Sequence, residues 1–262
     1  MELTENGPLY AVVHLEWKYS KSYIWQDLCV YAGERRIDFK TQVDMHETHQ
    51  LMKAAFPVDI RTTYATYDIQ YGNVRRPNNW NTSWDIAKFE MVLHKWVDLS
   101  DSGYGVSMMN DSKYGCDVKG NLLRLTLIKT ATNPDYLQDQ GMHQFTYSLY
   151  PHTGDVAHSH TEQTAYYLNN PVRTCAGTIQ TDSFLRFSAE NIMMDAVKCS
   201  EDQKYLVVRF HEFAGAQTPG FNYTAWTIGS LLEDPIEDFH GSGCVELTMH
   251  PFEINTLLFQ LS

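Results

Sequence analysis

The sequence lacks the features of a membrane protein or a nucleic-acid-binding protein. No apolar run approaches the roughly 20 residues that span a bilayer, and 20 Lys and Arg face 32 Asp and Glu, for a net charge of -12. An acidic chain without a dense basic run is a poor candidate for binding nucleic acid or an anionic membrane. The first residues resemble no secretory signal. We therefore expect a cytoplasmic protein with no nucleic-acid partner and no membrane partner.

Catalytic and metal-binding motifs are also scarce. There is no Gly-x-Ser-x-Gly elbow, phosphate loop or dinucleotide fingerprint. No metal-ligand spacing links the five cysteines, which are predicted to be reduced, partly buried thiols: Cys29, Cys116, Cys175, Cys199 and Cys244. The stretch HTGDVAHSH holds His152, His158 and His160, but no carboxylate or thiol at a familiar ligand spacing. A solvated face is the favoured interpretation of these histidines, and a zinc site is the alternative.

The chain is rich in aromatic residues, at 13%, and in short segments of alternating polarity. The segment YAVVHLEWKY, residues 10–19, places its apolar side chains on one face, and similar segments follow between Gly, Asn, Asp and Pro residues. This pattern is typical of an all-β sandwich or barrel, and 262 residues suit one large or two moderate β-domains. A helix is predicted over residues 155–170, before Pro171.

The segment NTSWDIAKFEMVLHKWVDLSD, residues 81–101, carries residue types suited to acid–base chemistry. Its β-branched and aromatic residues favour a strand over a helix. On a strand Glu90 and His94 share a face but lie about 13 Å apart, too far for direct proton exchange. The pattern therefore predicts a structural strand and no catalytic pair.

Several long stretches, in order along the chain, resemble the C-terminal part of glycoside hydrolase family 38 α-mannosidases, with the bacterial and cytosolic-type branch most similar. The main ones are AAFPVDIRTTYATYDIQYGNVRRPNNWNTSWDIAKFEMVLHKWVDLSDSGYGVSMMNDSKYGCDVKGNLLRLTLIK, QFTYSLYPHTGD, YLNNP, ENIMMDAVKCSEDQKYLVVRFHEFAGA and VELTMHPFEINTLLFQL.

The resemblance implies an all-β fold: a galactose-mutarotase-like β-supersandwich over residues 1–170, then a linker and a small C-terminal β-sandwich over residues 171–262, with one short helix between them. Family members carry catalysis upstream, in an α/β barrel-like domain followed by a helical domain. There a metal ion, usually zinc, and two Asp residues perform retaining hydrolysis of α-mannosides. None of those motifs occurs in this chain. We expect no catalytic or metal-binding residue here; the implied partners are the upstream domains, α-mannoside glycans and further copies of the full enzyme.

Some residues are candidates for the rim of the upstream active site. The resemblance aligns Lys129 with, or next to, a family arginine that reaches the active site, and a lysine lacks the bidentate fork of arginine. An exposed strand-end lysine is the alternative. Arg61, Trp80, Trp84 and Asp85 are candidates for lining a sugar-binding groove, although tryptophans suit a buried domain interface equally well.

The stretch NDSKYG, residues 110–115, predicts a turn. Asn110 and Asp111 suit side-chain bonding to the backbone, and Gly115 suits a positive φ.

Three functions follow from these observations. The first is a non-catalytic C-terminal part of an α-mannosidase that supports the catalytic domain and shapes the active-site rim. The second is a stand-alone carbohydrate-binding module. The third is a sugar epimerase on a mutarotase-like fold, which the sequence disfavours because no close His–Glu pair emerges.

Overall fold

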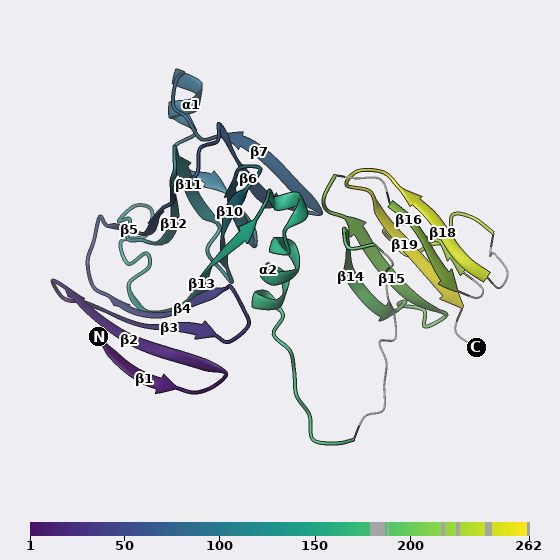
Figure 1. Ribbon diagram of the computed structural model, residues 1–262, viewed down its shortest axis with the longest axis horizontal. Coiled ribbons are helices and arrows are strands. Elements are labelled where there is room, and N and C mark those ends of the chain that lie inside the picture. The colour runs from purple at the N-terminus through teal and green to yellow at the C-terminus, as the bar shows by residue number, and fades with distance from the viewer. Residues whose placement is uncertain (179–186, 188, 216–217, 224–225, 239–242, 261–262) are drawn as a thin grey trace. The chain divides into compact units, whose positions relative to one another are not determined.

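The computed structural model describes residues 1–178, 187, 189–215, 218–223, 226–238 and 243–260. The chain forms two compact units, Met1–Ile69 with Val74–Val172, and Gln70–Asn73 with Arg173–Ser262. Strands dominate both units (Figure 1), which confirms the predicted all-β class. No described helix is long and apolar enough to cross a membrane.

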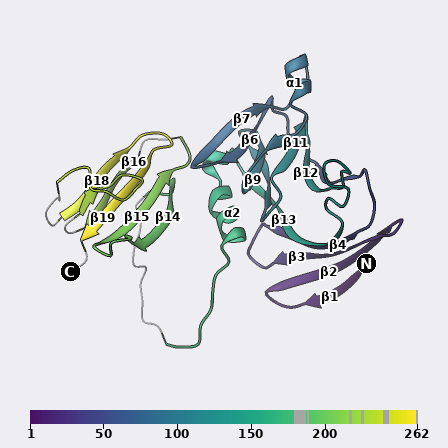
Figure 2. The same ribbon diagram turned by 180° about the vertical axis from the view of Figure 1, so that it is seen from behind.

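The first unit contains a large antiparallel sheet. Its nine strands lie in the order β1 (Glu2–Asn6), β2 (Tyr10–Tyr19), β3 (Ser22–Tyr31), β4 (Ile37–Met45), β13 (Gly141–Thr153), β10 (Tyr104–Asn110), β9 (Trp96–Ser100), β6 (Tyr64–Ile69) and β7 (Gly72–Pro77). Strands β1 to β4 are consecutive hairpins at one edge, visible from both sides (Figures 1 and 2).

A smaller sheet packs against this one. Its four strands are β5 (Leu51–Pro57), β12 (Leu122–Lys129), β11 (Gly115–Lys119) and β8 (Met91–Val92). In β12 the leucines at alternate positions are buried, while Arg124 and Thr126 between them are half-buried on the other face. The buried faces of the two sheets share one apolar core, which includes Val43, Val97, Leu99, Met108, Leu123 and Leu125. Each such fully buried side chain contributes about 1.5–3 kcal/mol.

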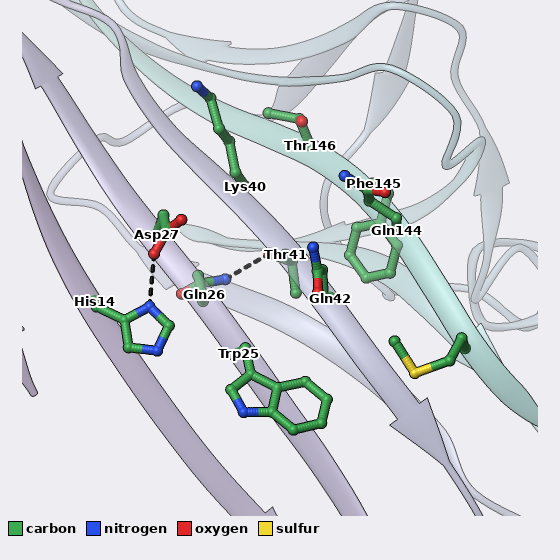
Figure 3. Close-up of a pocket in the computed structure, with 11 residues that line it drawn as sticks. His14, Trp25, Gln26, Asp27, Lys40, Thr41, Gln42, Gln144, Phe145 and Thr146 are labelled. Carbon is green, nitrogen blue, oxygen red and sulfur yellow. Dashed lines mark hydrogen bonds and ion pairs between the residues drawn. The ribbon is translucent and has the colours of Figure 1, made fainter.

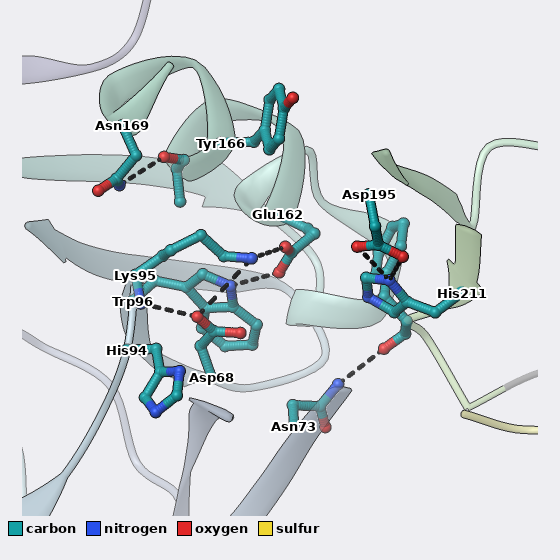
Figure 4. A network of polar contacts seen from close by, with 12 residues as sticks. Asp68, Asn73, His94, Lys95, Trp96, Glu162, Tyr166, Asn169, Asp195 and His211 are labelled. Atoms are coloured by element: carbon teal, nitrogen blue, oxygen red, sulfur yellow. Dashed lines mark hydrogen bonds and ion pairs between the residues drawn. The ribbon is translucent and has the colours of Figure 1, made fainter. Parts of the chain in front are cut away.

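Helix α2 (Thr161–Asn169) follows a 3-10 turn, η1 (Val156–His158), and covers part of the opposite face of the large sheet over β9 and β10. This confirms the predicted helix, which begins later than expected. Glu162 ties the helix to the sheet: it accepts a hydrogen bond from Trp96 Nε1 at 2.6 Å and pairs with Lys95, beside Asp68 (Figure 4). The apolar cluster beneath the helix is Trp96, Met109, Tyr150 and Ala165.

The prediction of a single strand, Phe89–Leu99, after an entry loop in residues 81–101 holds only in part. The segment forms a short helix, α1 (Ser83–Ala87), which Thr82 and Asp85 start with a capping box. It then forms β8 in the small sheet and β9 in the large sheet, because the chain crosses from one sheet to the other between them. Leu93, at this crossing, is fully buried. Lys95 also lies at this crossing, where it reaches Glu162.

The second unit is a small β-sandwich with its own core. One sheet has the order β14 (Ile192–Cys199), β15 (Tyr205–Glu212), β19 (Ile254–Gln260) and β17 (Trp226–Ile228), and the other pairs β16 (Thr218–Tyr223) with β18 (Gly243–Met249). Its core includes Ile192, Val208, Phe210, Trp226, Met249 and Leu257, so the two sheets share it.

Candidate functional site

A hollow of about 170 Å³ lies beside α1 in the first unit. Three cationic side chains, Arg75, Arg76 and Lys88, line it together with Trp80 and Asp85. Guanidinium and ammonium groups donate hydrogen bonds, and the Asp85 carboxylate accepts them. The hollow is therefore suited to hydroxyl-bearing or anionic groups.

Cation–π contacts hold the walls of this hollow. The ammonium of Lys119 lies 4.0 Å from the ring centroid of Trp80, and the guanidinium of Arg76 lies 4.6 Å from that of Tyr67. Arg76 also donates a hydrogen bond of 2.6 Å to the carbonyl oxygen of Val92. One side of Trp80 is thus already occupied by a cation, and the ring is half-buried.

The structure groups some of the predicted rim residues and separates another. Asp85 lines the hollow and Trp84, next to it on α1, is 79% exposed. Arg61 is exposed on a loop that Asn78 fastens to the same region, through a 3.0 Å bond to the carbonyl oxygen of Thr62. Lys129 is exposed at the other end of β12 from the turn beneath Trp80.

The separation between Trp80 and Lys129 follows from the geometry of strand β12. Lys129 lies seven positions after Leu122, at the start of β12, which corresponds to about 23 Å along the strand. Lys119, over Trp80, pairs with Leu122. One small ligand therefore cannot touch both Trp80 and Lys129.

Glu90 and His94 have separate partners. Glu90 pairs with Lys53 at 2.5 Å and accepts a hydrogen bond from Thr126, and Lys53 also pairs with Asp117 at 2.5 Å. Burial opposes the charge on Lys53, but the hydrogen bonds to Asp117 and Glu90 prevail and raise its pKa. The ring of His94 packs against Tyr114, with centroids 6.2 Å apart. Glu90 is therefore part of a structural ion network on the small sheet.

The predicted solvated face of three histidines is wrong for one of them. His158 and His160 are exposed, but His152 is buried in β13 and its Nε2 lies 2.7 Å from the Asp98 carboxylate. Asp98 also accepts hydrogen bonds from Ser100 and Ser107. Strand β13 extends to Thr153 and carries the buried His152 to Asp98, which Ser107 connects to Thr161 at the start of α2.

The NDSKYG turn behaves as predicted at Asn110, whereas Asp111 bonds a distant strand and Gly115 also differs from the prediction. Asn110 Oδ1 accepts from the Lys113 amide at 2.6 Å, and Asp111 accepts from the Thr146 amide at 2.9 Å. Gly115 does not have a positive φ. A Cβ at Gly115 would instead lie 2.9 Å from Glu90 Oε1, so the close approach of that carboxylate explains the glycine.

Sequence reasoning missed a second candidate site, a groove of about 550 Å³ on the large sheet (Figure 3). It is lined by side chains of β2, β3, β4 and β13, among them His14, Trp25, Asp27, Lys40, Gln42 and Gln144. His14 Nδ1 lies 2.7 Å from Asp27 Oδ1, and this bond, followed by the one to Glu16, raises the pKa of His14. The only signal in the sequence is the alternation in these strands, which does not reveal which strands pair.

Comparisons with known proteins place the chain among glycoside hydrolases. Residues 1–137 match "Glycosyl hydrolases family 38 C-terminal domain", and residues 191–257 match "Glycosyl hydrolases family 38 C-terminal beta sandwich domain". In solved structures, an α-mannosidase from Enterococcus faecalis V583 superposes with a TM-score of 0.81 and 21% identity, over 99% of this chain and 35% of that one. This likeness shows the fold.

Curated relatives are more similar in sequence. Alpha-mannosidase G of Dictyostelium discoideum is 34% identical over 98% of this chain and 26% of its own length. Human alpha-mannosidase 2C1 is 34% identical over 92% of this chain and 24% of its own length. The chain thus spans about a quarter of the length of these relatives. The family matches cover more than half of its residues, and the chain belongs to glycoside hydrolase family 38, as part of the C-terminal region of that family.

Proposed function

We propose that this chain is the non-catalytic C-terminal part of a cytoplasmic α-mannosidase, whose complete polypeptide hydrolyses α-mannosides with retention of configuration. The observation that carries the proposal is the pair of family 38 C-terminal matches, which occur in order along the chain. The 34% identity to relatives named alpha-mannosidase supports the activity of the complete polypeptide. Its restriction to about a quarter of their length supports a role outside the catalytic domain.

The family's metal ion and catalytic carboxylates belong, in this proposal, to upstream domains of the same polypeptide. Within the part of the chain that the structure describes, no group of three or more His, Cys, Asp or Glu residues could hold a metal ion. These residues therefore do not fit a zinc site. The contribution of this chain is to support the catalytic domain and to shape the surface around the bound glycan.

The surface around α1 is the part of the chain that we expect to meet the upstream domains. Four apolar side chains are exposed at and just after this helix: Trp84, Ile86, Phe89 and Val92. A cluster of exposed apolar side chains is commonly covered by a partner. If the upstream domains cover it, the hollow with Asp85 and its three cations lies at the border of that interface, as a rim would. Arg61 belongs to the same region, whereas Lys129 stays a separate prediction at the far end of β12.

Activity of a chimaera tests this role. The C-terminal quarter of Dictyostelium alpha-mannosidase G is replaced with this chain, and hydrolysis of an aryl α-mannoside is measured. We expect the chimaera to be active and the 262-residue chain alone to be inactive. Trp84→Ala in the chimaera should lower activity, while Trp17→Ala, at another exposed tryptophan, should leave it unchanged. Turnover by the chain alone, abolished by a chelator, would refute the proposal.

A second candidate function, a carbohydrate-binding module that holds glycan by itself, is favoured by the groove in Figure 3. Calorimetry on the isolated chain distinguishes the two functions, because a purely structural domain releases no heat when mannose oligosaccharides are added.

A further inference from the structure

The face of the large sheet opposite the main core has two halves. Helix α2 covers the half formed by β9, β10 and the second part of β13, where Trp96, Met109 and Tyr150 are buried. The half formed by β2, β3, β4 and the first part of β13 carries exposed side chains such as Lys40, Gln42 and Gln144. The groove in Figure 3 lies on this second half.

The strand register arranges the groove's side chains in two rows. The first row runs across four strands from His14 to Asp27, Lys40 and Thr146. The second row runs from Glu16 to Trp25, Gln42 and Gln144. Facing residues on antiparallel strands have Cβ atoms about 4.5–5.5 Å apart. Each row therefore presents polar groups at a spacing that neighbouring hydroxyl groups of a sugar can bridge.

Several of these polar groups have unused hydrogen-bonding capacity. The side chains of Lys40, Gln42 and Gln144 are exposed and make no hydrogen bond to another residue that the structure describes. By contrast, His14 is fixed between Asp27 and Glu16, with its ring nitrogens 2.7 and 3.3 Å from their carboxylates. An amide side chain both donates and accepts, as a sugar hydroxyl does.

Trp25 supplies an apolar platform beside these groups. Its ring stacks on Tyr23, with centroids 5.8 Å apart and planes 11° from parallel. Tyr23 holds the ring from one side, and the indole lines the groove. The electron-rich face of an indole attracts the weakly positive C–H groups on one face of a pyranose ring. A rigid aromatic ring also loses little conformational entropy when it binds.

Charge and size favour a neutral, hydroxylated ligand. The residues that line the groove include one carboxylate, Asp27, and one ammonium group, Lys40, whose formal charges cancel, and the Glu16 carboxylate at the end of the second row is paired with His14. Its volume of about 550 Å³ falls within the usual range for small-molecule sites. Eight of the eleven residues that line it are polar or charged, whereas the centre of a protein–protein interface is depleted of charged residues.

We propose that this groove binds a short neutral oligosaccharide, with Trp25 stacking on a sugar ring and Asp27, Lys40, Gln42 and Gln144 bonding its hydroxyls. The proposal goes beyond a supporting role for the chain and names the residues and ligand class through which the second candidate function, carbohydrate binding, would act. Only the choice of a mannose oligosaccharide as the first probe rests on the proposed function. Maltotriose is the second probe. If the chain does not come from an α-mannosidase, the groove can still bind maltotriose, whereas a groove that binds no saccharide gives no signal with either probe.

The experiment is a titration of the full 262-residue chain with α-linked mannotriose and with maltotriose, up to millimolar concentrations. Binding is followed by calorimetry and by the indole N–H resonances of the six tryptophans. The Trp25 resonance is assigned by its loss in Trp25→Ala. We expect this resonance to shift and Trp25→Ala to weaken binding at least about tenfold, because central aromatic anchors dominate binding.

Two further variants keep the result interpretable. Gln144→Ala, at an exposed position outside the core, should weaken binding several-fold without affecting folding. Trp17→Ala is the matched control: it removes an exposed tryptophan from β2, at an odd-numbered position whose side chain points away from the row of His14 and Glu16. Binding of either saccharide that both groove variants weaken and the control does not supports the proposal.

Several outcomes would overturn it. One is no binding of either saccharide by a folded chain. Another is binding that Trp25→Ala and Gln144→Ala leave unchanged. A third is self-association of the chain, measured by sedimentation, that Trp25→Ala abolishes, since the groove would then be a contact between copies of the chain.

Discussion

Replacing His152 with alanine should destabilise the first unit strongly, whereas the same change at His158 should have almost no effect. The two residues lie six positions apart in the same histidine-rich stretch. The His152 side chain is 2% exposed and its partner Asp98 is 0% exposed, while that of His158 is 83% exposed. The difference in burial between the two histidines is therefore the reason for the expected difference in stability.

The expected loss in the free energy of unfolding follows from the buried contact between His152 and Asp98. Removal of one partner leaves the Asp98 carboxylate buried with only Ser100 and Ser107 to satisfy it. Leaving a buried polar group without one of its hydrogen-bond partners in this way costs about 1–3 kcal/mol. For a unit of this size, each kcal/mol lowers the melting temperature by about 2–4 °C, so the expected loss is about 2–12 °C. His158→Ala should change the free energy of unfolding by no more than about 0.5 kcal/mol.

The assay is urea unfolding of the full chain, followed by tryptophan fluorescence. All the tryptophans except Trp226 lie in the first unit, and Trp96 is buried beneath α2 on β9, the strand that also carries Asp98. The midpoint for His152→Ala should move to lower urea with an unchanged slope. A loss below about 1 kcal/mol, or an equal loss for His158→Ala, would refute the assignment of His152 as a buried structural partner.

Three further predictions concern separate parts of the chain. Gly105→Ala should destabilise the chain by about 1–3 kcal/mol or more in thermal unfolding, because the added Cβ would lie 2.2 Å from Cε1 of His152. The pKa of His14, measured by NMR, should lie above its ordinary value of 6.5 and fall in Asp27→Asn, which removes the charge that favours the imidazolium. Since the folded pKa is raised, this pair stabilises the fold fully below pH 6.5 and loses that effect as pH rises through the folded pKa. The thiol of Cys116 should resist alkylation until the chain unfolds, because it is buried and burial raises its pKa, while Cys175 and Cys199, which are exposed, react at once.

Each of these has a clear contrary result. An unchanged melting temperature for Gly105→Ala would mean that His152 does not lie over the glycine. A His14 titration that Asp27→Asn leaves in place would mean that the two side chains are not paired in solution. Alkylation of Cys116 at the rate of Cys199 in the folded chain would contradict its burial in the core.

Some features could be read from the sequence because they depend on local patterns. Alternating polarity and turn residues predict short strands wherever one face is buried, and Asn110 bonds the nearby Lys113 amide as its short side chain suggests. In the segment of residues 81–101, alternating polarity does not predict the strands correctly. Its alternation continues through a place where the chain leaves one sheet and enters another, so one apparent strand is a helix and two strands.

The sequence by itself determined the all-β class and membership in glycoside hydrolase family 38, because strand patterns and long family motifs are carried by consecutive residues. The tertiary structure alone decided that His152 is buried beside Asp98, and that Gly115 makes room for Glu90. It also decided that His14, Asp27, Lys40 and Thr146 form one row, although more than a hundred positions separate the first from the last. The physical reason is that strand register and the coverage of a sheet face depend on pairing between distant segments, which local alternation does not encode.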